Sequence, residues 1–271
     1  MFEIKMQIMK TQLYPILAIF LAGFLTTGNS FSQFTGQEII QLVKDQPDGD
    51  NRKSVMTMTL VNKRGSKRER TMLSYAQDYG KDSKSIMFFK APADVQGTGF
   101  LTWNYDNPNN DDDRWLYLPA MKKTRRISGS SAKKEYFMGS DFTFDDMGGR
   151  NIDEDEHTLV GEEVLGDRNC WIIRSRPKEE DAIYSETVSW IWKDALTAIK
   201  VEFYDPMGDL QKTLTINDIR KTGAYWTVYG MEMENHQRNH QTLITIQEME
   251  YDINISENHF TVASLERGNV E

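Results

Sequence analysis

The side chains that could do chemistry are spread thinly along this sequence. His236 and His240 are four residues apart, but they lie in a polar stretch without the His-Glu-x-x-His helix of a zinc protease. Asp111, Asp112 and Asp113 offer oxygen ligands to calcium, but the glycine and distal glutamate of an EF-hand loop are missing. A polar connection and a solvated hairpin tip are the favoured interpretations. We therefore expect no metal site and no cofactor.

A third candidate is the segment 135–150, EYFMGSDFTFDDMGGR, which mixes aromatic residues with three aspartates. Paired carboxylates can act as acid and base, but no nucleophile, histidine or phosphate-binding loop lies nearby in sequence. The patterns G-x-S-x-G and C-x-x-C and the P-loop pattern are also missing. We therefore predict that the protein is not an enzyme, and a hydrolase of lipid or glycan is the weakest alternative.

A basic run precedes this segment. Residues 122–134 hold six Lys and Arg side chains, including Arg125 and Arg126, in an acidic protein. One interpretation is a solvated charged loop. The other is a site for an amphiphile, in which Arg or Lys pairs with an anionic head group and pliable methionines and aromatic rings pack on the acyl chain.

The beginning of the chain has the pattern of a secretory signal. Lys5 and Lys10 precede an apolar run at 13–25, and small serines follow, as a signal peptidase requires. That run is too short for a membrane span, which needs roughly 20 apolar residues. We predict a signal peptide over 1–32, cleaved near Ser32, and export to the periplasm.

The remainder, 33–271, fits one domain, because no second composition regime or internal repeat is visible. Removing the signal leaves a formal charge near −10, starting from −9 for the whole chain. A negative surface repels phosphate backbones, which excludes nucleic acid as a primary partner. The single cysteine, Cys170, cannot form an internal disulfide, and its apolar neighbours indicate a small core residue.

Hydrophobic periodicity predicts one helix followed by many strands. Thr35 and Glu38 form a capping box, and the helix should end before Pro47. From Ser54 onward the apolar period is two, as in strands. Short strands without intervening helices indicate a curved or closed antiparallel sheet. The two-residue period is absent over 119–155, and a connection of this length is typical of a functional loop. We expect strands at 54–60, 71–75, 85–90, 99–105, 113–118, 158–165, 169–175, 186–193, 197–204, 210–218, 225–233 and 241–252.

Several spaced motifs resemble one family. They are RWLYLP at 114–119, RRI at 125–127, FMGSDF at 137–142, DD at 145–146, FT at 260–261 and LERG at 265–268. In this order they are similar to the outer membrane lipoprotein-sorting protein family, which is related to the periplasmic lipoprotein carrier LolA. The resemblance covers nearly all of 33–271.

The resemblance implies a mainly β protein: a half-open antiparallel β-barrel of the LolA/LolB kind, with about eleven strands, an N-terminal helix and a helical or loop lid. It also implies a carrier that binds acyl chains of a lipoprotein or lipid and moves them towards the outer membrane. An inner-membrane exporter of the RND or MMPL type and an outer-membrane acceptor would be its partners.

We interpret the segment 135–150 as a lid or rim over an apolar cavity. Its aspartates would fix the loop by accepting backbone hydrogen bonds or by pairing with Arg125 and Arg126. The alternatives are a structural plug, and an adaptor that docks on an exporter or an outer-membrane partner through Trp115, Tyr117 and the basic run. The expected ligand-binding residues are Met56, Met58, Trp115, Tyr117, Phe137, Met138, Phe142, Phe144, Trp190, Trp192, Arg125 and Arg126, and the aspartates are Asp141, Asp145 and Asp146.

Overall fold

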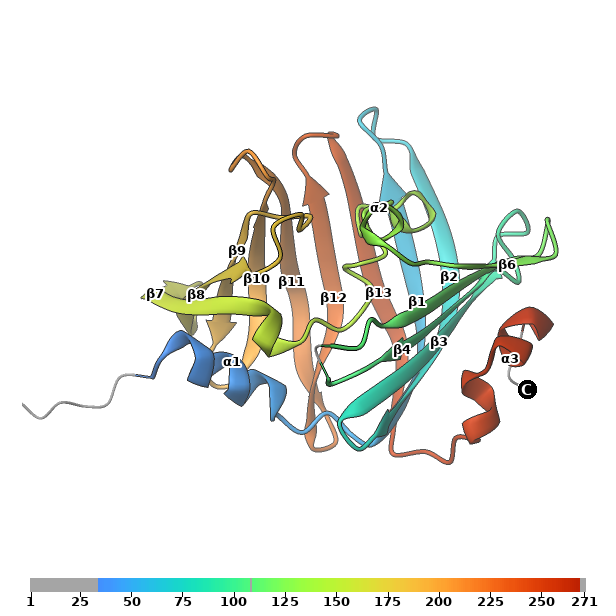
Figure 1. The fold of residues 1–271 in the computed structure, drawn as a ribbon, viewed down its shortest axis with the longest axis horizontal. Helices are drawn as coiled ribbons and strands as arrows, with labels where there is room; N and C mark the ends of the chain where they lie inside the picture. The colour runs from blue at the N-terminus through green and yellow to red at the C-terminus, as the bar shows by residue number, and fades with distance from the viewer. Residues whose placement is uncertain (1–33, 108, 269–271) are drawn as a thin grey trace, which may run out of the picture. The chain divides into compact units, whose positions relative to one another are not determined.

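The computed structural model describes residues 34–107 and 109–268, and all of its strands belong to one antiparallel sheet (Figure 1). The strand order is β6-β5-β4-β3-β2-β1-β13-β12-β11-β10-β9-β8-β7, so β6 and β7 form two open edges. The predicted signal peptide lies outside the described residues. The strands are β1 (Asn51–Val61), β2 (Lys67–Tyr79), β3 (Asp82–Ala91), β4 (Gly99–Asn104), β5 (Asp113–Leu118), β6 (Lys123–Arg126), β7 (Asp155–Leu165), β8 (Arg168–Pro177), β9 (Glu186–Trp192), β10 (Thr197–Tyr204), β11 (Leu210–Thr222), β12 (Tyr225–Asn235) and β13 (His240–Tyr251).

The mainly β, half-open antiparallel fold is confirmed, and the strand number is corrected. Each of the twelve expected segments falls on one strand, whereas the family resemblance implied about eleven strands and the described residues form thirteen. The strand that periodicity missed is β6, which lies inside the predicted break and pairs with β5. Its sequence, KTRR, is entirely polar and therefore shows no alternation.

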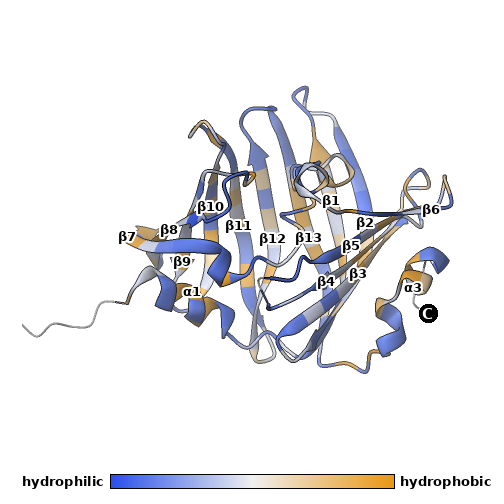
Figure 2. Cartoon of the chain, viewed as in Figure 1, coloured by the Kyte–Doolittle hydropathy of each residue, from blue (hydrophilic) through white to orange (hydrophobic). Residues whose placement is uncertain are grey.

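The pairing register separates the sheet into two faces. Met58 of β1 lies opposite Ile244 of β13, which lies opposite Met231 of β12. Met231 in turn lies opposite Ile216 of β11. We call this side the inner face and the other side the outer face. Hydrophobic and hydrophilic residues alternate along the strands in Figure 2, as two differently surrounded faces require.

The helix α1 (Gly36–Lys44) covers the inner face near one open edge. Thr35 is its N-cap, the reciprocal bonds with Glu38 are both present, and the helix ends before Pro47 as predicted. Ile39 is completely buried and packs in a cluster with Ile173 of β8 and Ile191 of β9. The helix therefore closes the β7–β9 end of the inner face.

The C-terminal helices cover the outer face at the other end. The 3₁₀ helix η3 (Glu257–Phe260) and the helix α3 (Val262–Arg267) place Phe260 and Leu265 in a buried cluster with Leu101 of β4. A Cβ atom on Gly99 would lie only 2.6 Å from a Leu265 methyl group, so a larger residue here would displace the Leu265 side chain.

We predict that Ile39→Ala lowers the free energy of unfolding by about 2–5 kcal/mol, because it leaves a cavity between α1 and the sheet. Urea denaturation followed by tryptophan fluorescence measures the change. Leu210→Ala, at a position that is 37% exposed, is the control and should change the free energy far less. Equal effects of the two substitutions would contradict the docking of α1.

Candidate functional site

The inner face is covered at its centre by the connection between β6 and β7. We call residues 129–150 the lid segment; it contains the short helix α2 (Ser130–Lys133) and the 3₁₀ turn η1 (Phe137–Gly139). Phe137, Phe142 and Phe144 are 0%, 7% and 3% exposed and belong to the same cluster as the apolar side chains of the inner face. The lid segment is therefore a packed part of the core.

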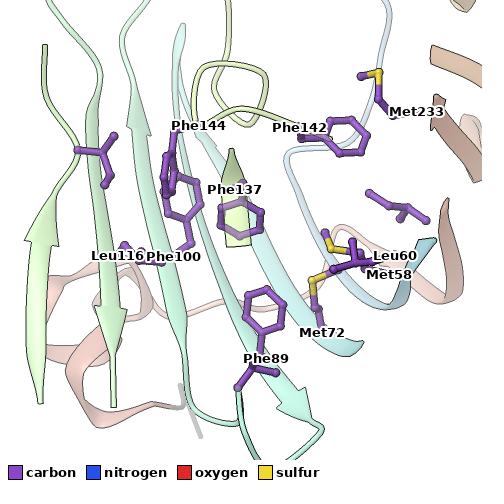
Figure 3. Packing of buried hydrophobic residues seen from close by; sticks show 13 residues of the cluster. Met58, Leu60, Met72, Phe89, Phe100, Leu116, Phe137, Phe142, Phe144 and Met233 are labelled. Carbon is purple, nitrogen blue, oxygen red and sulfur yellow. The ribbon is translucent and has the colours of Figure 1, made fainter. Parts of the chain in front are cut away.

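The rings of the lid segment pack against rings of the sheet in tilted arrangements (Figure 3). The Phe137 centroid lies 5.2 Å from that of Phe100 and 6.0 Å from that of Phe89. Phe144 lies 5.6 Å from both Phe100 and Phe137. Figure 3 shows Phe142 apart from these rings, next to Met233 of β12. Such ring pairs add roughly 0.5–1.5 kcal/mol each beyond area burial.

A tight turn gives the lid segment its shape. Phe137 N–H donates to Phe142 C=O at 2.7 Å, which closes the loop on itself. Met138 and Gly139 have φ angles of 49° and 77°, a left-handed conformation that glycine adopts readily and methionine rarely. The Arg70 guanidinium of β2 donates a hydrogen bond to the Met138 carbonyl at 2.5 Å, and this bond stabilises the unfavourable backbone conformation of Met138.

Asp141 fastens the middle of the lid segment to β13. Its side chain is fully buried, its Oδ2 lies 2.6 Å from His240 Nδ1, and it accepts a hydrogen bond from the Thr242 hydroxyl at 2.8 Å. Arg238 Nη1 lies 3.4 Å from Oδ1, and its guanidinium covers the Tyr136 ring at 4.0 Å. A buried carboxylate is tolerated only with such partners, so Asp141 fixes this loop to the β12–β13 hairpin.

Asp146 makes the second attachment, to β11. The fully buried Lys212 ammonium lies 2.6 Å from Asp146 Oδ2 and donates to the Asp141 carbonyl at 3.1 Å. Asp146 also accepts from the Thr143 N–H at 2.6 Å and from the Tyr184 hydroxyl at 2.9 Å. Burial lowers the pKa of Lys212, and Asp146 opposes that shift; burial and Asp146 together raise the pKa of Tyr184.

Arg114 of β5 binds the end of the lid segment. Its guanidinium is 3% exposed and lies 3.0 Å from Asp112 and 3.5 Å from Asp145. A Cβ atom on Gly148 would lie 2.0 Å from Arg114 Nη2, so any side chain at this position would displace the buried guanidinium. A Cβ atom added to the neighbouring Gly149 would have no contact closer than 3.4 Å.

A cavity of about 600 Å³ adjoins the lid segment on the side of β8–β12. Its apolar wall includes Phe142 of the lid segment and Phe203, Leu214 and Met233 of the sheet, whereas its remaining lining is largely charged. Phe142 belongs both to the core cluster and to the cavity wall, so the cavity continues the space that the lid aromatics fill.

The expected apolar binding residues divide among three hydrophobic clusters of the sheet. Met56, Met58, Phe137, Met138, Phe142 and Phe144 lie in the inner cluster or pack against it, and Phe142 alone among them also lines the cavity.

Trp115 and Tyr117 lie on the outer face, where they pack with the C-terminal helices. Trp190 is 8% exposed and belongs to a separate buried cluster with Ile199 and Ile216, and Trp192 packs against that cluster. Lys200 and Arg168 lie over the rings of Trp190 and Trp192 at 4.1 and 4.8 Å.

The expected pairing of Arg125 and Arg126 with the lid aspartates is wrong. Arg125 lies 2.7 Å from Glu135, and Arg126 pairs with Asp113. The expected backbone hydrogen bond to an aspartate is confirmed for Asp146. Cys170 is completely buried, as its apolar surroundings indicated.

The partners of the aspartates escaped sequence reasoning. Lys212, Arg238 and His240 lie about 70 to 100 positions further along the chain, and only the strand pairing brings them to the lid segment. One signal was available in the sequence. Lys212 has the same two-residue spacing as Leu214 and Ile216, so it lies on a strand face that is otherwise apolar.

The described residues give two further findings. None of their helices combines the length and the apolar character that crossing a membrane requires. No three of their His, Cys, Asp or Glu side chains are arranged to hold a metal ion.

An open antiparallel sheet with a lid packed on its inner face is a LolA-like fold. A LolA superfamily protein from Nitrosomonas europaea has this fold, with a TM-score of 0.67 and 15% identity over 86% of this chain and all of that one. A family model with the description "-like: Uncharacterized protein" matches residues 81–267.

Two solved structures are more similar in sequence. A DUF1329 family protein from Desulfovibrio piger is 33% identical, with a TM-score of 0.81 and coverage of 85% of this chain and 97% of that one. A putative outer membrane lipoprotein-sorting protein domain from Vibrio parahaemolyticus is 31% identical, with a TM-score of 0.80 and coverage of 86% and 98%. The chain belongs to the family of these two proteins, which confirms the resemblance seen in the sequence. No curated protein is significantly similar to the chain.

We predict that Lys212→Met destabilises the protein by about 3–5 kcal/mol, because it leaves the Asp146 carboxylate buried without its cation. Adding Asp146→Asn should recover part of this loss and give a coupling of about 0.5–3 kcal/mol in a double-mutant cycle. Urea denaturation gives all four values. Lys67→Met, at an exposed position of β2, is the control. Additive single effects would show that the two side chains do not act as a pair.

We predict that Gly148→Ala costs about 1–3 kcal/mol, since the added methyl group displaces the buried Arg114 guanidinium. Gly149→Ala is the matched control one residue away, where the methyl group fits at ordinary contact distance. Thermal unfolding compares the two. A Gly149→Ala variant that is less stable than Gly148→Ala would refute the role of Arg114.

Proposed function

We propose that the protein is a periplasmic carrier that binds the acyl chains of a lipid or lipoprotein against its inner face and moves them towards the outer membrane. The observation that carries this proposal is an apolar sheet face that no second sheet covers. A loop lies over its centre, and a cavity adjoins that loop. Sandwich proteins cover such a face with more strands. Here the cover is α1 at one end and, at the centre, the lid segment, which is held by buried phenylalanines and by a few polar contacts.

The size of the cavity suits this function. Its volume of about 600 Å³ lies within the usual range for small-molecule sites, which is roughly 300–1,000 Å³. Each buried CH₂ group contributes about 0.8 kcal/mol. About ten methylenes would thus supply the free energy of micromolar binding before the costs of association are subtracted.

The remaining features of the proposal follow from the family and the sequence. Residues 1–32 act as a signal peptide cleaved near Ser32, and 33–271 form a single carrier domain in the periplasm. The carrier performs no catalysis, receives its cargo beside an RND- or MMPL-type exporter of the inner membrane and delivers it to an outer-membrane acceptor. The sorting function in the name of the Vibrio relative supports this direction.

One observation favours a second function. Phe137 and Phe144 already fill the centre of the inner face, as an adaptor whose cavity is closed by its own side chains would require. Such an adaptor would bind an exporter or an outer-membrane partner and carry no lipid. Trp115 and Tyr117 pack against the C-terminal helices, so the basic run is the more accessible part of the proposed docking surface.

Native mass spectrometry before and after organic extraction separates the two functions. We expect the purified protein to carry an extractable lipid, or to take up an acylated probe after extraction. A protein that is free of lipid and also fails to take up the probe would support the adaptor instead.

We predict that Ala182→Trp reduces the affinity for a fluorescent fatty-acid probe by about tenfold or more, because the indole fills the cavity beside its apolar wall. Ala182 lies on a loop, so the core stays unchanged. Met207→Trp, on a turn where the side chain is 87% exposed, is the control. Probe titration measures both, and unchanged binding by Ala182→Trp would place the acyl chain elsewhere.

A further inference from the structure

We propose that one end of the sheet docks on an anionic lipid bilayer through exposed lysines and arginines and through Met121. We call this surface the basic end. It consists of the β1–β2 hairpin tip (61–70), the connection from β3 to β4 with the residue before it (90–98) and the β5–β6 turn (119–123). The proposal goes beyond the carrier function, because none of these residues lines the cavity and docking requires no bound cargo.

Strand direction brings the three connections to the same end of the sheet. Because neighbouring strands are antiparallel, β1, β3 and β5 end there, and β2, β4 and β6 begin there. The second and third connections touch, since a Cβ atom on Gly97 would lie 3.6 Å from the Pro119 side chain. The β1–β2 hairpin projects beyond β3, because Lys67 to Arg70 pair with β1 and the pairing of β2 with β3 starts only at Thr71 (Figure 1).

The basic end has the opposite charge to the protein as a whole. It holds eight Lys and Arg side chains against two carboxylates, Glu69 and Asp94, in a chain whose formal net charge is −9. One of the eight, Arg70, is bound to the lid segment at the Met138 carbonyl. The other seven are exposed and make no ion pair within the described residues: Lys63, Arg64, Lys67, Arg68, Lys90, Lys122 and Lys123.

The opposite end of the same strands is acidic, and cations there are paired. Lys44 and Lys81 lie 2.5 and 3.8 Å from Asp106, and Arg52 lies 3.0 Å from Asp48. Charge is thus separated along the strands in this half of the sheet. The resulting field would turn the basic end towards a negatively charged surface and the acidic end away from it. The carboxylates of the acidic end include Asp48, Asp50, Asp78, Asp82 and Asp106.

Met121 gives the basic end an apolar contact. Its side chain lies in the β5–β6 turn and is 57% exposed, although methionine is usually buried. Lys122 and Lys123 follow it directly. An apolar side chain next to cations suits the membrane–water interface, where apolar burial and attraction to anionic lipids add to each other. Met121 is therefore an observation independent of the charges, and it points to the same kind of partner.

The arrangement favours a bilayer over a folded acidic protein. Protein partners are recognised through an apolar, well-packed interface core. Met121 is the only large apolar side chain of the basic end, as far as the structure describes it, that is exposed. The seven exposed cations are distributed over three connections. A bilayer presents many mobile anionic head groups, which can follow such a dispersed pattern of charge.

Docking in this way would bring the lid segment close to the bilayer. Arg68 and Arg70 are two residues apart on β2, so both lie on the face of the strand that Arg70 turns towards Met138. If the protein carries lipid, a chain that moves between the bilayer and the inner face would then have a short path.

Binding of the purified protein to sedimented vesicles tests the proposal. One set of vesicles contains phosphatidylcholine alone, and the other contains equal parts of phosphatidylcholine and phosphatidylglycerol. We expect about tenfold or greater preference for the second set, lost at high salt. Lys63→Gln with Arg64→Gln should weaken that binding about tenfold. Lys81→Gln with Lys221→Gln removes the same charge from exposed positions at the opposite end and should leave binding unchanged.

A fluorescent label tests the contact of Met121 with the bilayer. Because Cys170 is completely buried, a thiol reagent on the folded Met121→Cys variant labels the new position selectively. The emission of an environment-sensitive label there should shift to the blue when the phosphatidylglycerol vesicles are added. The same label on Ala224→Cys, in the exposed β11–β12 turn at the opposite end, should not shift.

Each contrary result has a definite meaning. Absence of binding, or equal binding to the two sets of vesicles, would overturn the proposal. Equal weakening by the two double substitutions, or a shift at Ala224→Cys without one at Met121→Cys, would refute the assignment to the basic end. The carrier function is judged separately by the fatty-acid probe. A protein that binds anionic vesicles but not this probe would retain the docking surface and lose the carrier function.

Discussion

The structure depends on one constraint: a wide sheet with an apolar inner face has no second sheet to cover it. Water cannot remain on such a face without a large cost, because each Å² of exposed apolar area costs about 25 cal/mol. The helix α1 covers one end of the face, and the lid segment covers its centre. A cavity beside the lid segment remains unfilled by protein side chains. How completely these elements cover the face decides how much apolar surface is left for a ligand.

The way the lid segment is attached differs from ordinary core packing. Its rings are apolar, but Asp141 and Asp146 anchor it through buried contacts with His240, Lys212 and Thr242. Buried ion pairs contribute little net stability compared with apolar contacts of the same volume, and we infer that these anchors act mainly by selecting one geometry of the lid segment. The anchors therefore fix where the lid segment sits and where the cavity begins, which a purely apolar loop would leave less defined.

Much of the fold was predictable because local patterns carry it. The Thr35 capping box and the two-residue period place the helix and twelve strands without long-range information. The site was less predictable, because the partners of the lid aspartates come from strands distant in sequence. The inward or outward direction of Trp190 depends on register, and alternation alone does not determine it. Such properties arise from strand pairing and from bulges, which short sequence windows do not record.

The central claim is that acyl chains bind on the inner face, and photo-crosslinking tests it most directly. A lipid with a diazirine near the end of its acyl chain would be bound, irradiated and located by peptide mass spectrometry. The account predicts labelling of Phe203, Leu214 and Met233 beside the lid segment. Labelling confined to the outer face, at Trp115, Tyr117 or the strands beneath α3, would contradict it.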